Sequence, residues 1–132
     1  MARIPFGIDR LDSRVGGGAP SGSVVLLAGE SGAGAREFLH TSAVMNGLQA
    51  TAPDLFELHY GDLYRDVTPP AEIHYISFTA DETELRHEIT FTLDDELVDA
   101  GLESVAFQVF SPEFFQLSPV PSEWYTGTRR DI

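Results

Sequence analysis

Hydrophobic residues gather in three short runs along this chain, and each run predicts a β-strand. The runs span residues 23–28, 73–78 and about 104–110. The first is almost continuously apolar, which is typical of a strand buried on both faces of a parallel sheet. We therefore expect residues 23–28 to form an interior strand.

Two longer segments between these runs have the hydrophobic spacing of amphipathic helices. Residues 35–49 bring several small and apolar side chains near one face: Phe38, Leu39, Ser42, Ala43 and Met45, with Gly47 near the end. Residues 81–100 repeat an apolar side chain every four positions: Leu85, Ile89, Leu93 and Leu97. Residues 79–82 have the form of a capping box, and Gly101 stands where a glycine commonly ends a helix.

The order strand, helix, strand, helix, strand predicts an α/β fold with a mostly parallel sheet covered by helices. We expect one domain over residues 1–132, with a lead-in at 1–22, a core at 23–110 and an irregular tail at 111–132. Residues 54–58, inside a long connection, could form a short turn of helix.

The predicted tail is rich in proline and in aromatic residues, namely Phe114, Phe115, Trp124 and Tyr125. Aromatic side chains anchor many protein interfaces, so the tail could bind a partner. It could equally pack back over the edge of a short sheet. Nothing in the sequence separates these two interpretations.

The charge is strongly acidic, with 21 Asp and Glu against 8 basic residues, all of them Arg, and a net charge of -13. An acidic surface without lysine favours a protein of a salt-loving archaeon, although an acidic protein from a GC-rich genome is the alternative. Nucleic acid is an unfavourable partner because phosphate binding needs clustered cations. The chain has no cysteine, no apolar membrane-spanning run and no apolar signal region, so we expect it in the cytoplasm.

A glycine-rich loop connects the first predicted strand to the first predicted helix. A phosphate-binding loop has the pattern G-x-x-x-x-G-K-[ST]. Both glycines have this spacing here, but Ala35 replaces the lysine and Arg36 replaces the Ser or Thr. The candidate nucleotide-binding residues are Gly29, Glu30, Ser31, Gly32, Ala33, Gly34, Ala35 and Arg36.

Backbone N–H groups and a helix N-terminus supply much of the anion binding in such loops. Ala35 leaves these groups in place but removes the ammonium that bridges the outer phosphates, and Arg36 removes a hydroxyl ligand of Mg²⁺. We therefore expect at most weak binding of ATP or ADP, without Mg²⁺. Arg36 could replace part of the missing charge, but it points about 100° away around the helix.

Two stretches before this loop, GIDRLD at 7–12 and GGGAPSGS at 16–23, resemble the KaiC/RadA-like branch of RecA-fold ATPases. The similarity continues less closely through residues 75–78 and 84–86 to about Val109, and covers the front part of the family domain. It resembles the haloarchaeal proteins described as RecA-superfamily ATPases or HTR-like proteins. The resemblance implies a RecA-like three-layer sandwich, ATP binding, and assembly into rings or filaments.

The chain departs from the family pattern at the residues that perform catalysis. The family has an acidic pair after the second strand, where this chain has Thr79 and Ala80, and Asp81 and Glu82 look like acids at a helix start. The family's aspartate-tipped strand would lie beyond the third predicted strand, where no further apolar run follows. We therefore expect no catalytic residues and no metal-binding residues. One interpretation of the short length is that the chain is a fragment of the family domain.

The hypothesis from sequence is a non-catalytic, nucleotide-binding-type domain with a regulatory or signal-transduction role. Its partner would be a second copy or a regulatory protein. An active ATPase that uses Arg36 or residues of a neighbouring subunit is one alternative, and a truncated product without independent function is another. The four histidines are scattered, and Glu84, His87 and Glu88 predict an ion-paired helix face rather than a metal site.

Overall fold

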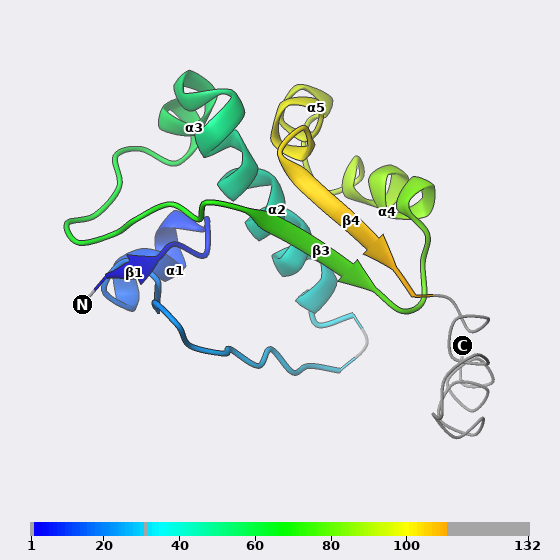
Figure 1. Ribbon diagram of the computed structural model, residues 1–132, viewed down its shortest axis with the longest axis horizontal. Helices are drawn as coiled ribbons and strands as arrows, with labels where there is room; N and C mark the ends of the chain where they lie inside the picture. The colour runs from blue at the N-terminus through cyan, green and yellow to red at the C-terminus, as the bar shows by residue number, and fades with distance from the viewer. Residues whose placement is uncertain (1, 31, 111–132) are drawn as a thin grey trace.

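The computed structural model describes residues 2–30 and 32–110, which form an α/β unit around a pair of parallel strands (Figure 1). The expected tail at 111–132 and its aromatic residues lie outside the described residues. The elements in chain order are β1 (Arg3–Ile4), α1 (Asp9–Arg14), β2 (Ala19–Pro20), α2 (Ala35–Thr51), α3 (Pro53–His59), β3 (Ile73–Ser77), α4 (Glu82–Ile89), α5 (Asp95–Leu102) and β4 (Val105–Val109).

The parallel sheet consists of β3 and β4, in a register that runs from Ile73 opposite Val105 to Ser77 opposite Val109. Helices α4 and α5 form the crossover between the two strands, as a parallel pair requires. The structure therefore confirms an α/β fold with a parallel sheet, and confirms both predicted strands to within one residue at each end.

Helix α2 is the centre of the packing, because it lies behind the sheet and along α5 (Figure 1). Two glycines bring the helices close together. A Cβ on Gly47 would collide with the carbonyl of Gly101, and a Cβ on Gly101 would collide with the carbonyl of Val44. The buried hydrophobic core surrounds this contact and comprises Val44, Met45, Leu48, Phe56, Tyr60, Ile89, Leu97, Val98, Leu102 and Val105.

The prediction of a buried strand at residues 23–28 is wrong. These residues are extended but pair with no strand among the described residues, and all of them are exposed. Val24 keeps 98% of its surface accessible and Leu26 keeps 88%. The apolar run predicts a strand because strand propensity depends on the local sequence. A strand forms in a sheet only when a second strand lies beside it.

The predicted helix over 81–100 is in fact two helices, α4 and α5, with a break at residues 90–94. Asp81 caps α4, since its Oδ1 accepts the Glu84 N–H at 2.8 Å. The capping residue is therefore Asp81 and not Thr79. Gly101 lies inside α5 rather than beyond a helix end. Gly101 allows α5 to approach α2 closely. In the sequence, a glycine required by helix packing looks the same as a glycine that ends a helix.

The other helices follow the sequence more closely. Helix α2 begins at the predicted residue, Ala35, and ends two residues later than predicted, and α3 extends the predicted turn at 54–58 by a residue at each end. The lead-in is more ordered than expected, because it contains α1 and the antiparallel pair β1–β2. Among the described residues, no helix has both the length and the apolar character needed to cross a membrane.

Candidate anion-binding loop and neighbouring groove

The glycine loop leads directly into the N-terminus of α2. Gly34 is the N-cap of α2 with a φ of 94°, and Gly32 has a φ of 86°. Both values lie in the left-handed region, which residues with a Cβ adopt at a cost. No atom lies within 4 Å of a Cβ built on either glycine, so the backbone conformation rather than lack of space requires glycine here. Ser31 lies outside the described residues.

The first turn of α2 presents its N–H groups at the end of this loop, because the first N–H groups of a helix have no partner within the helix. Gly34 has no side chain to cap them. The described loop residues Gly29, Glu30, Gly32 and Ala33 are exposed. Such an N-terminus favours an anion, whereas the carboxylates of Glu30 and Glu37 oppose one.

Arg36 is bound to Glu88 of α4 instead of lying over the loop. Its Nε donates to Oε1 of Glu88 at 2.7 Å, and its second guanidinium nitrogen donates to Oε2 at 2.7 Å. This bidentate pair raises the pKa of Arg36 and lowers the pKa of Glu88, in each case mainly through the hydrogen bond. An anion would therefore compete with Glu88 for the guanidinium.

His40 lies one turn further along α2 with a side chain that is only 1% exposed. Its Nε2 is 3.9 Å from Oε1 of Glu88, beyond hydrogen-bonding distance, and neither ring nitrogen has a hydrogen-bond partner. Burial lowers the pKa of His40, and the positive charge of Arg36 acts in the same direction. His40 is therefore a neutral core residue at neutral pH.

Residues 78–80, directly after β3, are Phe78, Thr79 and Ala80 and carry no carboxylate. Ser77 Oγ accepts the N–H groups of Thr79 at 3.4 Å and Ala80 at 3.1 Å. The next acid, Asp81, is occupied by the α4 cap. The interpretation of Asp81 as an acid at a helix start is confirmed.

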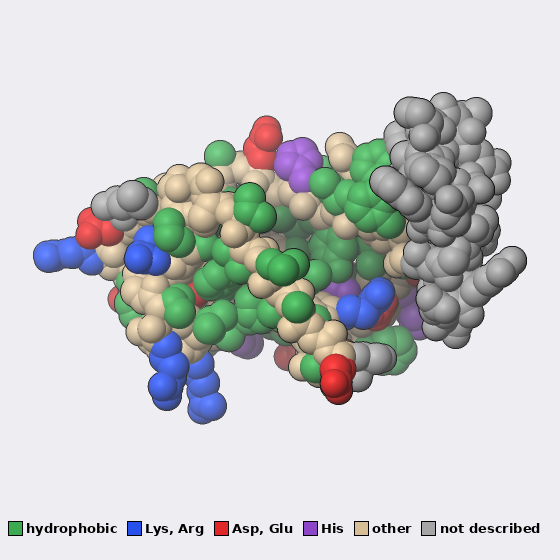
Figure 2. Space-filling model, turned by 90° about the horizontal axis from the view of Figure 1, so that it is seen from below, with side chains coloured by type: hydrophobic (Ala, Val, Ile, Leu, Met, Phe, Trp, Pro, Cys, Tyr) green, Lys and Arg blue, Asp and Glu red, His purple; other side chains and the backbone are tan. Residues whose placement is uncertain are grey.

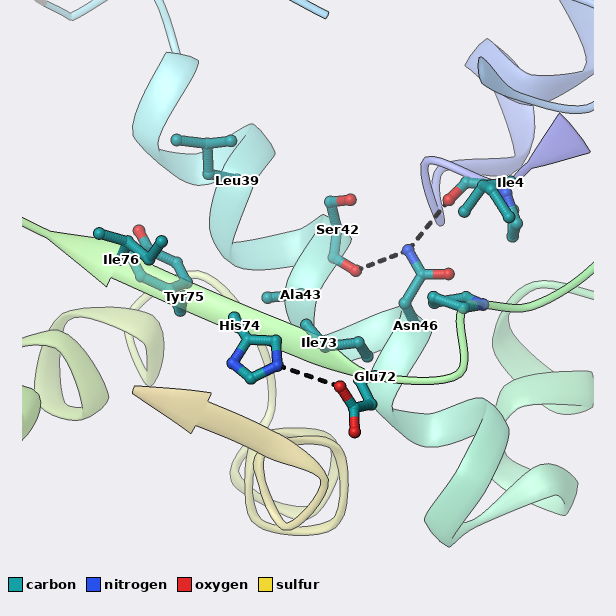
Figure 3. Close-up of a pocket in the computed structure, with 12 residues that line it drawn as sticks. Ile4, Leu39, Ser42, Ala43, Asn46, Glu72, Ile73, His74, Tyr75 and Ile76 are labelled. Atoms are coloured by element: carbon teal, nitrogen blue, oxygen red, sulfur yellow. Dashed lines mark hydrogen bonds and ion pairs between the residues drawn. The ribbon is translucent and has the colours of Figure 1, made fainter. Parts of the chain in front are cut away.

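A groove of about 400 Å³ lies between α2, the N-terminal segment and β3 (Figure 3). Its apolar lining includes Ile4, Leu39, Ala43 and Ile76. Asn46 joins two of its walls, because its Nδ2 donates to the carbonyls of Pro5 at 3.0 Å and Ser42 at 2.9 Å. Sequence reasoning missed this groove, since its walls come from segments about seventy residues apart that only the fold brings together.

The N-terminal segment is held by a buried carboxylate that sequence reasoning also missed. Asp12 is fully buried, and its oxygens accept the N–H groups of Phe6 and Gly7 and the hydroxyl of Tyr60 at 2.6 Å. Burial and the neighbouring carboxylate raise the pKa of Tyr60 well above its usual value. Asp12 is the last residue of the GIDRLD stretch, and the hydrophobic pattern of that stretch did not predict that this acid is buried.

Among residues 2–30 and 32–110, no three His, Cys, Asp or Glu side chains lie together as a metal site would require. Comparisons with models of protein families, with curated proteins and with solved structures found no match to this chain. The resemblance to the KaiC/RadA-like ATPases consequently rests on the residues that carry it.

Proposed function

We propose that this chain is a RecA-like, phosphate-loop-derived domain that binds nucleotide weakly, does not hydrolyse it, and has a regulatory or signal-transduction role. The observation that carries the proposal is the form of the loop at α2. Gly32 and Gly34 have left-handed φ values and lead into the first turn of α2, which has no side-chain cap, while Arg36 is bound to Glu88.

The lack of catalytic groups supports the non-catalytic part of the proposal. Ala35 offers no cation at the position of the lysine, and the segment after β3 offers Thr79 and Ala80 where a general base would stand. Phosphoryl transfer depends on positioned positive charge and an activated water. The alternative, an active ATPase that uses Arg36, requires the guanidinium to leave Glu88 for the phosphates.

Restoring the missing lysine tests whether the loop is an anion site. The variant Ala35→Lys should bind MgATP or ADP at least about tenfold more tightly than the natural chain in calorimetric titrations in molar KCl, because the new ammonium reaches the phosphates. Ala50→Lys is the matched control, since it adds the same charge at an exposed position near the other end of α2. If Ala35→Lys and the natural chain both fail to bind at millimolar nucleotide, the loop is not an anion site.

A phosphate-release assay separates the two functional hypotheses. We expect no release above background from the natural chain at high salt. Release that disappears in Arg36→Ala would establish the active ATPase and reject the non-catalytic proposal.

A further inference from the structure

An exposed apolar segment and a strand edge without a partner occur together among residues 2–30 and 32–110. The segment is residues 23–28, which we call the 23–28 segment, and its apolar residues are Val24, Val25, Leu26 and Leu27. The edge belongs to β3, which pairs in the described part of the chain with β4 alone. An open strand edge presents unpaired N–H and C=O groups to any strand that can lie along it.

The 23–28 segment has the side-chain pattern of a strand that needs cover on both faces. Exposure alternates along it, from 98% at Val24 to 55% at Val25, 88% at Leu26 and 42% at Leu27. Alternate residues of an extended chain point to opposite sides, so apolar groups lie on both sides of the segment. Figure 2 shows hydrophobic side chains gathered on the face of the molecule that carries it.

The groove along β3 provides complementary apolar surface. Ile76 is 50% exposed and Leu39 is 49% exposed, and both line it. Figure 3 shows β3 and α2 forming two of its walls. A strand added to β3 would place alternate side chains against α2 and the others beside Ile76 on the outer surface.

The structure points to a second copy of this chain as the occupant. The segment follows a turn in which the Ser23 N–H donates to the Pro20 carbonyl at 3.1 Å, and it precedes the loop that leads into α2 at Ala35. Among the described residues no strand pairs with it. We propose that the 23–28 segments of two copies are exchanged, each adding a strand to the β3 edge of the other.

Charge favours this occupant. The chain carries a net charge of -13, yet residues 15–29 contain no charged side chain. Two copies can therefore approach through this segment without placing carboxylates against each other, and salt screens the remaining repulsion. Because each exchange uses the same two surfaces, the dimer is closed and two-fold symmetric.

The exchange buries apolar area on both copies. Each apolar side chain that faces the groove removes on the order of 100 Å² from water when it is buried. Two such side chains on each segment bury roughly 400 Å² in the two exchanges, and backbone pairing along the β3 edge adds to this contact.

Cross-linking tests the pairing directly, because the natural chain has no cysteine. We would mix two single variants, Val25→Cys and Ile76→Cys, in molar KCl and treat them with a short bis-maleimide, which tolerates a shift in strand register. We expect a cross-link between the two variants, identified by mass spectrometry. The control pair replaces Ile76→Cys with Leu58→Cys, on the exposed side of α3, and should not cross-link to Val25→Cys.

Light scattering after size exclusion tests the oligomeric state. The natural chain should be a dimer, and Leu26→Asp should weaken the dimer at least tenfold without changing the circular dichroism spectrum, because Leu26 is exposed in the monomer. Leu58→Asp, an equally polar change at an exposed leucine, should remain a dimer. A natural chain that is monomeric at every concentration, or a Leu26→Asp variant as dimeric as the natural chain, would overturn the proposal. Neither result depends on nucleotide binding at the loop.

Discussion

Arg36 and Glu88 form a bidentate ion pair between the first turn of α2 and the end of α4, with both nitrogen–oxygen distances at 2.7 Å. The two residues are 52 positions apart in the chain. Arg36 is the only basic residue among residues 29–36, and this pair holds its guanidinium against a carboxylate of another helix. The pair is therefore the contact on which the two functional hypotheses differ most.

Releasing Arg36 should strengthen anion binding at the loop. We expect Glu88→Gln to bind inorganic pyrophosphate severalfold more tightly than the natural chain, because a neutral amide competes less well for the guanidinium. Calorimetric titration measures the effect. Glu82→Gln is the matched control, since it breaks a similar exposed pair, Arg86–Glu82, within α4. Equal affinities in the two variants would show that Arg36 does not reach the anion.

The same pair should contribute little to stability. Its side chains are 54% and 37% exposed, so solvent screens their attraction. We expect Arg36→Ala to lower the free energy of unfolding by less than about 1 kcal/mol in urea titrations. A substantially larger loss would mean that the pair holds α4 against α2.

The buried hydrogen bond between Tyr60 and Asp12 should contribute more to stability than the exposed hydrogen bond between Tyr64 and Asp9. Tyr60→Phe removes a hydrogen bond to a buried carboxylate and should cost about 1.5–3 kcal/mol. Asp12→Ala removes the acceptor of three donors, of which the Gly7 N–H and the Tyr60 hydroxyl are buried, and should cost roughly 2–5 kcal/mol. Tyr64→Phe is the control, because the Tyr64 hydroxyl donates to exposed Asp9 at 2.7 Å, and its urea midpoint should stay close to that of the natural chain.

The close packing of α2 against α5 should require glycine at positions 47 and 101. Replacing a helical glycine with alanine ordinarily stabilises a helix by up to about 1 kcal/mol. Here Gly47→Ala and Gly101→Ala should instead each destabilise the protein by about 1–3 kcal/mol, because the added methyl group meets backbone of the facing helix. Thermal unfolding measures both, and a rise in either melting temperature would contradict the close approach.

Buried His40 should make stability depend on pH. Because burial lowers its pKa in the folded protein, the unfolded chain binds the extra proton first as the pH falls below about 6.5. Stability from this residue is complete above that pH and declines as the pH decreases toward the folded pKa, with a slope of at most about 1.4 kcal/mol per pH unit. Urea titrations between roughly pH 5 and pH 7.5 follow this window.

The variants His40→Gln and His59→Gln test whether His40 causes this pH dependence of the free energy of unfolding. His40→Gln should flatten the pH dependence in this range, whereas His59→Gln, at an exposed position of α3, should leave it unchanged. An unaltered slope in His40→Gln would assign the pH dependence to other groups, with the Arg36–Glu88 pair the next to test at lower pH.

Local patterns determined much of this protein. Apolar runs predicted β3 and β4, and helical spacing predicted α2, because each of these depends on neighbouring residues. A local pattern cannot show whether residues 23–28 find a strand beside them, that the helix predicted over 81–100 breaks at residues 90–94, or that Gly101 lies in the contact with α2.

Only the tertiary structure decided the rest. It brought Glu88 to Arg36 and Tyr60 to Asp12, it left the apolar segment at 23–28 exposed, and it opened the groove beside β3. These features join segments separated by tens of residues, so they depend on how the elements pack and not on the order of residues within any one of them. The same physical reason explains why the sequence did not reveal that one edge of β3 is unpaired among the described residues.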